Sequence, residues 1–235
     1  MKDKYLRETR MVDFSNPAIQ KLIQNMKWKE MGEFERIKAI YNYVRDDVLF
    51  GYNIDDGISA SKVLADGYGQ CNTKGTLFMA LLRACSIPCR VHGFTIDKRL
   101  QKGAMTGFVY RNAPQNVLHS WVEVYLDDTW YELEAFILDK EYLNKLQKIN
   151  SQCSGAFCGY GVAVKDFQNP VIDFERNNTY IQNEGINQDF GIYNSPDELL
   201  AEHHQEMSIV KAFAYRHLGR HLMNKNVKRI RDAQV

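Results

Sequence analysis

Apolar residues recur at helical spacing through the first part of the chain. Those that follow Pro17 predict an N-terminal helix that begins near this proline, and those within Glu35–Val48 share one face of an amphipathic helix. A polar loop over Gly51–Gly57 then leads to a short helix over Ala60–Asp66, for which Ser59 is the expected N-cap. The N-terminal part of the fold is therefore expected to be helical.

The period of the pattern changes near the middle of the chain. Cys71–Ala84 is apolar nearly all round, which predicts a central, buried helix. Alternation with a period of two begins at Cys89 and returns over Leu118–Leu126, and each segment predicts a strand. Asp127-Asp128 marks a turn, after which Thr129–Leu133 predicts the returning strand. Helices followed by an antiparallel sheet indicate an α+β fold.

The pattern weakens beyond residue 140. Glu141–Ile149 predicts a helix, whereas Gly155–Gly191 predicts loops with short extended pieces. Ser195-Pro196-Asp197-Glu198 is a capping box with proline at the first helical position, and it predicts the start of a C-terminal helix. We expect two parts: a core with N-terminal helices over residues 1–145, and an appended segment over residues 146–235 that packs on this core.

The composition is that of an ordinary globular chain, in which 45% of the 235 residues are hydrophobic and 25% are charged. Lys and Arg number 30 against 29 Asp and Glu, so the overall charge favours neither nucleic acid nor an anionic membrane as a partner. No apolar run resembles the core of a signal peptide or is long enough to cross a bilayer. We therefore expect a cytoplasmic protein.

The five cysteines, an odd number, argue against a framework of disulfides. Four of them can be imagined as a four-thiolate zinc site, namely Cys85, Cys89, Cys153 and Cys158. Their spacings, with three and four intervening residues, differ from the compact pairs of zinc ribbons. Buried free thiols are the expected state of these four residues, and we assign no metal.

Cys71, the fifth cysteine, has a different setting. Gly67–Gln70 forms a flexible turn that delivers the chain to Cys71 at the start of an apolar helix. A helix N-terminus stabilises a thiolate through the macrodipole and through N–H groups without a helical partner. Gly69 allows a close backbone approach, and Gly75 leaves room beside the helix one turn later. A small buried cysteine at a helix start is the alternative, and Cys71 by itself would favour it.

His119 strengthens the case for chemistry at Cys71. On the strand Leu118–Leu126, one face is apolar and turned to the core, and His119 lies on the opposite face beside Trp121. A single histidine on such a face is usually a surface residue, but this one is framed by aromatic side chains. A cysteine and a histidine with an acid behind it form an activated nucleophile.

The turn at Asp127-Asp128 determines which acid lies near His119. If these two residues form the whole loop, Trp121 on one strand faces Glu134 on the other. Glu134 then lies diagonal to His119 on the same face, within reach of a long side chain. Glu132 shares this face but lies two residues further away, so it is the weaker candidate. A three-residue loop would instead turn Glu134 to the other face.

Three separated motifs resemble those of the transglutaminase-like superfamily: GYGQC before an apolar helix, then LLRACSIPCRV, then HSWVEVYLDDTWYELE. The resemblance runs from about Glu35 to about Asp139. It implies a papain-like core in which a cysteine, a histidine and an acid form a catalytic triad. Carried over by position, the triad is Cys71, His119 and Glu134.

Two positions depart from the pattern of this family. The acid of the triad is usually aspartate, so Glu134, which is one methylene longer, requires an adjusted geometry. Asn72 stands where the animal enzymes have a tryptophan. The calcium sites of those enzymes cannot be traced in this sequence, so no calcium is assigned.

We therefore expect a cysteine enzyme that transfers the acyl group of a peptide or protein amide through a thioester, without a cofactor. Water as acceptor gives hydrolysis of the peptidase or amidase type, and an amine acceptor gives transamidation. The Cys71 N–H is one expected oxyanion donor. The second donor and the lining of the site are sought among four further residues, namely Gln70, Asn72, Tyr52 and Trp121.

A non-catalytic transglutaminase-like module for binding or scaffolding is the alternative function. Cys71 and His119 favour the enzyme, because a binding module has no need of both. The glutamate at position 134 keeps the alternative open, because the family usually has aspartate there.

Three further features are given structural interpretations. His203, His204 and Glu206 lack the spacing of a helical metal motif, which favours a solvated helix. Residues 211–235 carry seven Lys or Arg and one acid, and a polar C-terminal helix is favoured there over a surface for nucleic acid or acidic lipid. Four aromatic residues of the appended segment either line a substrate groove or replace a regular core, namely Tyr160, Phe167, Tyr180 and Phe190.

Overall fold

The computed structural model describes residues 3–205 and 208–234. Its helices are α1 (Pro17–Met26), α2 (Glu33–Asp46), α3 (Ala60–Asp66), α4 (Cys71–Ala84), α5 (Gly107–Asn112), α6 (Lys140–Ile149), α7 (Pro196–Glu202), α8 (Ile209–Ala214) and α9 (Arg220–Arg231). Its strands are β1 (Leu49–Phe50), β2 (Tyr68–Gly69), β3 (Cys89–Asp97), β4 (Asn116–Leu126), β5 (Thr129–Leu133), β6 (Phe157–Gly159), β7 (Val162–Val164) and β8 (Ile186–Tyr193). Shorter turns include η3 (Lys98–Gln101), η4 (Ala135–Ile137) and the π-helical η6 (Tyr215–Gly219).

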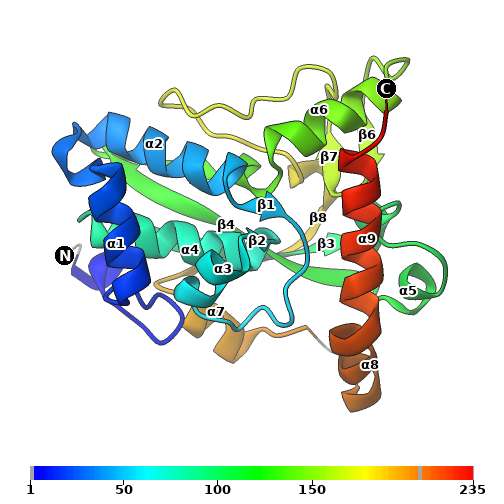
Figure 1. Ribbon diagram of the computed structural model, residues 1–235, viewed down its shortest axis with the longest axis horizontal. Coiled ribbons are helices and arrows are strands. Elements are labelled where there is room, and N and C mark those ends of the chain that lie inside the picture. Colours follow the sequence, from blue (N-terminus) through cyan, green and yellow to red (C-terminus); the bar gives the residue numbers. More distant parts are fainter. Residues whose placement is uncertain (1–2, 206–207, 235) are drawn as a thin grey trace.

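An antiparallel sheet in the strand order β5–β4–β3–β8 forms one layer, and helices of the N-terminal half form the other (Figure 1). The central helix α4 contacts β3 and β4 and also contacts α1, α2 and α3. Because α4 lies between the sheet and the other helices, it has no solvated face. The fold is therefore α+β, with N-terminal helices packed on an antiparallel sheet, as the sequence predicted.

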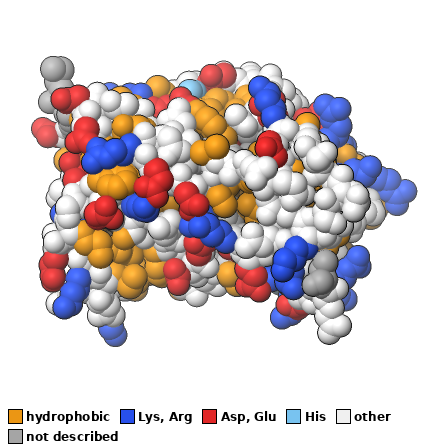
Figure 2. Space-filling view, turned by 90° about the horizontal axis from the view of Figure 1, so that it is seen from above, with side chains coloured by type: hydrophobic (Ala, Val, Ile, Leu, Met, Phe, Trp, Pro, Cys, Tyr) orange, Lys and Arg blue, Asp and Glu red, His pale blue; other side chains and the backbone are white. Residues whose placement is uncertain are grey.

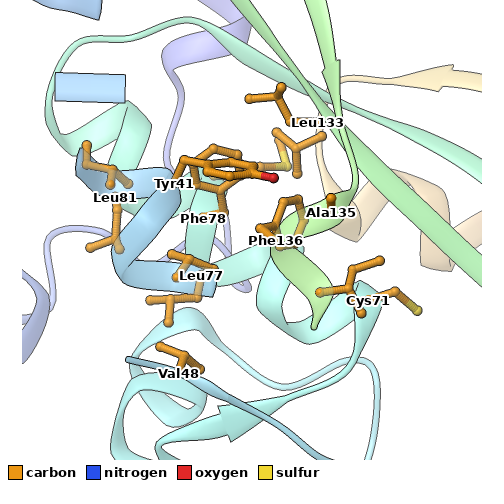
Figure 3. Packing of buried hydrophobic residues seen from close by; sticks show 14 of the residues in the cluster. Tyr41, Val48, Cys71, Leu77, Phe78, Leu81, Leu133, Ala135 and Phe136 are labelled. Carbon is orange, nitrogen blue, oxygen red and sulfur yellow. The ribbon is translucent and has the colours of Figure 1, made fainter. Parts of the chain in front are cut away.

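Every residue of α4 is buried, which the all-round apolar pattern predicted. Its two basic side chains, Lys74 and Arg83, donate to backbone carbonyls, which offsets part of the cost of burying them. Lys74 Nζ donates to the carbonyls of Arg45 and Ile137, at 3.1 and 3.0 Å, and Arg83 likewise donates to backbone carbonyls. Figure 3 shows Cys71 at the edge of the apolar cluster, with its sulfur pointing away from the aromatic side chains.

The hairpin of β4 and β5 has the predicted two-residue turn. Asp127 and Asp128 both have positive φ, at 47° and 60°, which matches the twist of a two-residue hairpin loop. The register is the predicted one, but pairing with β4 ends at Leu133. The predicted pair of Trp121 and Glu134 therefore does not form, and that part of the prediction is wrong.

Where the pairing with β4 ends, Thr179 from the C-terminal half of the chain forms backbone hydrogen bonds with Glu132 and Glu134. Glu134 N–H donates to the Thr179 carbonyl at 2.9 Å, and Thr179 N–H donates to the Glu132 carbonyl at 3.0 Å. These bonds turn the chain away from β4 and into η4. The sequence pattern could not show this competition, because Thr179 lies far along the chain.

Strand β8 begins inside Gly155–Gly191, the stretch predicted as loops with short extended pieces. It is a half-exposed edge strand that pairs with β3, so its residues show no alternation that would mark a strand. The register of this pairing shifts between Gly93 and Phe94. Leu199 of α7 packs over Gly93 so closely that a Cβ there would lie 2.3 Å from Leu199 Cδ1.

Helix α7 begins at the predicted capping box. The Ser195 hydroxyl accepts from the Glu198 N–H at 3.2 Å, and Pro196 is the first helical residue. The helix ends at Glu202, so the prediction of a solvated helix over His203 and His204 is wrong; Glu206 lies outside the described residues. The His203 ring stacks on Phe190, with ring centroids 3.8 Å apart.

The last helical segment runs from α8 through η6 to α9. The C-terminal end of α9 contacts α6, and the segment crosses the loop that follows β1 (Figure 1). Met223 and Val227 of α9 are buried against the core, while Ile209 and Phe213 of α8 are exposed. The polar C-terminal helix is therefore present, and one face of it is anchored. The division of the chain at residue 145 stays a prediction.

The surface seen in Figure 2 carries acidic and basic side chains that are interspersed, with apolar areas between them. Among residues 3–205 and 208–234, no helix has the length and hydrophobicity needed to cross a membrane. The same described residues contain no group of three or more His, Cys, Asp or Glu that could hold a metal ion. Cys85 and Cys89 are buried free thiols, whereas Cys158 is exposed.

Candidate active site

Cys71 is the first residue of α4, where its backbone N–H lies outside the intrahelical ladder. The turn before it is fixed by side chains: Gln70 N–H donates to Thr73 Oγ1 at 3.1 Å, and Asn53 N–H donates to Gln70 Oε1 at 2.8 Å. A Cβ at Gly69 would lie 2.7 Å from Thr73 Oγ1, so only glycine fits this close approach. The residue Cys71 is 8% exposed.

His119 on β4 and Glu134 after β5 form a fully buried pair. The His119 Nε2 atom lies 2.7 Å from Glu134 Oε1, and both residues are 0% exposed. The other carboxylate oxygen, Oε2, accepts from the backbone N–H groups of Ile181 and Gln182, at 2.7 and 2.8 Å. Both oxygens are therefore engaged, and the carboxylate has one orientation from which to align the imidazole.

Cys71 lies near the imidazole, because it is among the groups that shift the pKa of His119. The second ring nitrogen of His119, Nδ1, is buried and makes no aligned hydrogen bond with the residues that the structure describes. Burial by itself lowers the pKa of His119, but the charge and hydrogen bonding of Cys71, followed by those of Glu134, raise it to about 10. The surroundings of His119 therefore favour the imidazolium form of the ring.

The side-chain amide groups of Gln70 and Asn72 form hydrogen bonds with other residues of the protein. Gln70 Nε2 donates to Asp56 Oδ1 at 2.8 Å. Asn72 Nδ2 donates to the Leu118 carbonyl at 3.3 Å, and Asn72 Oδ1 accepts from Ser120 Oγ at 2.8 Å. These two side chains fasten the start of α4 to the neighbouring loop and strand.

Trp121 and Tyr52, the other two candidates, are both buried. The Trp121 ring packs on Phe94 with centroids 4.1 Å apart, and its Nε1 has no hydrogen-bond partner among the described residues. The Tyr52 hydroxyl donates to Gln101 Oε1 at 2.5 Å. Cys71 is among the groups that raise the pKa of Tyr52, after burial, Tyr142 and Tyr215, so the phenol lies within the electrostatic reach of the thiol.

Several residues that contact the site come from the C-terminal half and escaped prediction. Ile181 and Gln182 hold Glu134 through backbone groups, which carry no side-chain signal in a sequence. Asn224 of α9 binds the backbone of Tyr52, and Tyr215 of η6 donates to the Asn53 carbonyl at 3.1 Å. Of the four aromatic residues left open above, Phe167 is fully buried and belongs to the core.

A helix-start cysteine, a strand histidine and a buried glutamate on an α+β scaffold define a cysteine-centred site on a papain-like core. The family model for the transglutaminase-like superfamily matches residues 20–135, which hold Cys71, His119 and Glu134. This part of the chain belongs to the transglutaminase-like superfamily, and the resemblance carried by the sequence motifs is confirmed. The family and the geometry together support catalysis based on a cysteine.

Two solved structures are similar to the chain at low identity. One is of a putative cysteine protease from Cytophaga hutchinsonii, with 15% identity and a TM-score of 0.47, and the match covers 83% of this chain and 47% of that protein. The other is of a putative protease from Parabacteroides distasonis, with 13% identity and a TM-score of 0.36, covering 72% of this chain and 30% of that protein. The chain thus spans less than half of either protein. No curated protein matches the sequence.

Proposed function

We propose that the protein is a cysteine enzyme that transfers the acyl group of an amide, with Cys71 as nucleophile, His119 as acid and base, and Glu134 as the orienting acid. One observation carries this proposal: the buried imidazole has Glu134 fixed 2.7 Å from one nitrogen, and the Cys71 thiol lies close enough to raise the pKa of the ring. A peptide or protein amide is the proposed substrate, and the reaction needs no cofactor.

In the first half of the reaction, the Cys71 thiolate attacks the carbonyl carbon of the amide. The S–C bond forms while the π electrons of the carbonyl move to oxygen, which becomes an oxyanion. His119 has taken the thiol proton and now gives it to the amide nitrogen as the C–N bond breaks. The amine leaves, and a thioester remains on Cys71. Glu134 keeps the imidazole aligned and stabilises its positive charge.

In the second half, an acceptor attacks the thioester carbonyl. Neutral His119 takes a proton from the acceptor as its new bond to carbon forms, and the C–S bond then breaks to restore the thiolate and imidazolium pair. Water as acceptor yields a carboxylic acid, which is peptidase or amidase chemistry. A primary amine yields a new amide, which is transamidation.

A binding or scaffolding module is the second candidate function. The enclosure of the site favours it, since Cys71 is 8% exposed and both His119 and Glu134 are 0% exposed. Such a module would keep the buried pair for stability and would have no reactive thiol. The two functions therefore differ in the reactivity of Cys71.

The test uses p-nitrophenyl acetate, a small activated acyl donor. We expect the native protein to release about one equivalent of p-nitrophenol in a burst, with the acetyl group mapped to Cys71 by peptide mass spectrometry. Cys71→Ala should lose both signals, and the control Cys158→Ala, at an exposed thiol, should keep them. Acetylation on another cysteine, or an unchanged burst in Cys71→Ala, would contradict the proposal and favour the binding module.

A further inference from the structure

The C-terminal helical segment, residues 208–231, carries apolar side chains on its exposed side. Helix α8, the π-helical η6 and helix α9 follow one another in this segment without a break. Five large hydrophobic residues of the segment are exposed, namely Ile209, Val210, Phe213, Leu218 and Leu222. Ile209 and Val210, at 88% and 77%, are the most exposed large hydrophobic side chains in the part of the chain that the structure describes. In Figure 1, α8 projects below the other helices and the sheet.

The exposed apolar residues form one stripe along the segment. Phe213 follows Ile209 by four residues, and Leu222 follows Leu218 by four, so each pair shares a helix face. The step of five from Phe213 to Leu218 falls in η6. A π-helix takes more residues per turn than an α-helix, so a step of five there keeps both side chains on one face. The π-helical turn therefore aligns the apolar residues of α8 with those of α9.

The stripe continues into basic residues along α9. Lys225 and Arg229 follow Leu222 at steps of three and four, and both are exposed. Neither forms an ion pair with any residue in the described ranges 3–205 and 208–234. The whole segment holds seven Lys or Arg and no Asp or Glu. The stripe is therefore apolar at the α8 end and cationic toward the end of α9.

The opposite face of the segment is fixed to the core. Gly219, Met223 and Val227 recur at a spacing of four and are buried. The Asn224 amide also bonds to the N–H and the carbonyl of Tyr52, at 2.7 and 3.0 Å. A groove that takes up a helix surrounds more of its surface than one stripe, whereas a flat surface contacts one side only. The anchored segment is thus suited to a flat partner.

We propose that the C-terminal segment docks on the surface of an anionic lipid bilayer. The apolar part of the stripe enters the boundary between headgroups and acyl chains, and Lys225 and Arg229 meet the lipid phosphates. The inference goes beyond the proposed function and does not depend on the reactivity of Cys71. The sequence alone favoured a polar helix, because a count of charges does not show which apolar side chains the fold leaves uncovered.

Two features together favour a lipid surface over other partners. A nucleic acid offers phosphates to the cations, but it offers no apolar layer to Ile209 and Val210. A second copy of the segment offers apolar side chains, but it has no acid to place against Lys225 and Arg229. An anionic bilayer supplies both the negative charge and the apolar layer.

Flotation with lipid vesicles tests this inference. The native protein should bind vesicles made of phosphatidylcholine and phosphatidylglycerol in equal amounts, and it should bind pure phosphatidylcholine vesicles at least about 10-fold more weakly. Higher salt should weaken binding to the anionic vesicles, because it screens the attraction between exposed charges. Equal binding to both compositions, or binding to neither, would overturn the inference.

Two double variants separate the apolar part of the stripe from the basic part. Ile209→Ser with Phe213→Ser removes apolar contact and should weaken binding to anionic vesicles by about 10-fold or more. Lys225→Ala with Arg229→Ala removes two cations and should weaken this binding by about 20-fold. All four positions are exposed, so circular dichroism should show an intact fold. Native affinity in either double variant would contradict docking through the stripe.

Matched controls lie elsewhere on the surface. Lys21→Ala with Lys29→Ala removes the same charge from exposed positions in and beside α1, and Val171→Ser removes an exposed apolar side chain outside the segment. Both controls should bind anionic vesicles like the native protein. An equal loss in the lysine control would reduce the effect to net charge and overturn the inference.

Sedimentation of the native protein without lipid tests the competing partner, a second copy of the chain. We expect the native protein and Ile209→Ser with Phe213→Ser to have the same oligomeric state. A native dimer that this double variant converts to a monomer would assign the stripe to a contact between copies, and the inference would be overturned.

Discussion

Glu134 stands where the family usually has aspartate, and its surroundings explain the longer side chain. One carboxylate oxygen lies 2.7 Å from His119 Nε2, and the other accepts two backbone N–H groups from Ile181 and Gln182. The carboxylate therefore bridges β4 and the C-terminal half of the chain. An aspartate would be one methylene too short to keep all three contacts without movement of the backbone.

Glu134→Gln tests the role of this charge. A neutral amide cannot stabilise the imidazolium, so acetylation of Cys71 by p-nitrophenyl acetate at neutral pH should fall by about 100-fold or more. Glu134→Asp keeps the negative charge, but its side chain is too short to hold the imidazole in the same position. The rate of acetylation should therefore fall by about 10-fold. Circular dichroism checks that the fold is intact. A native rate in Glu134→Gln would mean that the imidazole is aligned by other groups.

Glu134→Gln should also shift the pH dependence of Cys71 acetylation, and the direction of the shift can be predicted. Burial lowers the pKa of His119, and Cys71 and then Glu134 raise it. Without the Glu134 charge the pKa must fall, so the imidazolium is lost at a lower pH. We expect the basic limb of the pH profile of acetylation to move to lower pH in Glu134→Gln, and NMR titration of His119 to show the same shift. A shift to higher pH would contradict this account.

At the scale of secondary-structure elements, α7 packs closely on β3 because Gly93 of β3 has no side chain. Leu199 is 2% exposed and occupies the space where a Cβ at Gly93 would lie. This contact coincides with the register shift between β3 and β8. Overpacked cores lose stability because side chains or backbone must move.

Gly93→Ala should lower the free energy of unfolding by about 1–3 kcal/mol, measured by urea denaturation. Leu199→Ala alone should cost about 2–5 kcal/mol through the cavity that it leaves. The double variant should be more stable than the sum of the two single losses predicts, because the smaller side chain makes room for the new methyl group. Strict additivity would show that the two residues do not compete for space.

Across the whole molecule, the last helix is tied to the first strand through one carboxylate. Asp139 caps α6 by accepting from the Tyr142 N–H at 2.8 Å, and its other oxygen accepts from Phe50 N–H and from Arg231. The Asp139 side chain is 2% exposed and that of Arg231 is 13% exposed. Loss of one partner would leave the other buried and less well paired.

Arg231→Ala should lower the free energy of unfolding by about 2–3 kcal/mol and increase hydrogen exchange at the amides of residues 50–53. Lys228→Ala is the matched control, because Lys228 is exposed and pairs with Asp232 at 3.8 Å on the same helix. Its effect should stay below about 0.5 kcal/mol. Equal effects of the two substitutions would argue that α9 does not brace this loop.

Features fixed by local spacing could be predicted from the sequence. The burial of α4 followed from its all-round apolar pattern, and the turn at Asp127 and Asp128 gave the correct register of the hairpin. Edge strand β8 was missed because half-exposed residues show no alternation. The helix expected at His203 was also wrong, and in the structure that ring stacks on Phe190. In both places the residues contact a partner elsewhere in the sequence, which the local pattern does not show.

The sequence by itself determined the neighbourhood of Cys71: glycines before a buried helix, and a histidine and an acid on one hairpin. Only the tertiary structure decided how those groups are held. Glu134 is fixed by the backbone N–H groups of Ile181 and Gln182. The backbone of Tyr52, beside the start of α4, is hydrogen-bonded by Asn224, 172 residues away. The physical reason is that periodicity and turn geometry act over a few residues, whereas hydrogen bonds between distant segments exist only once the chain has folded.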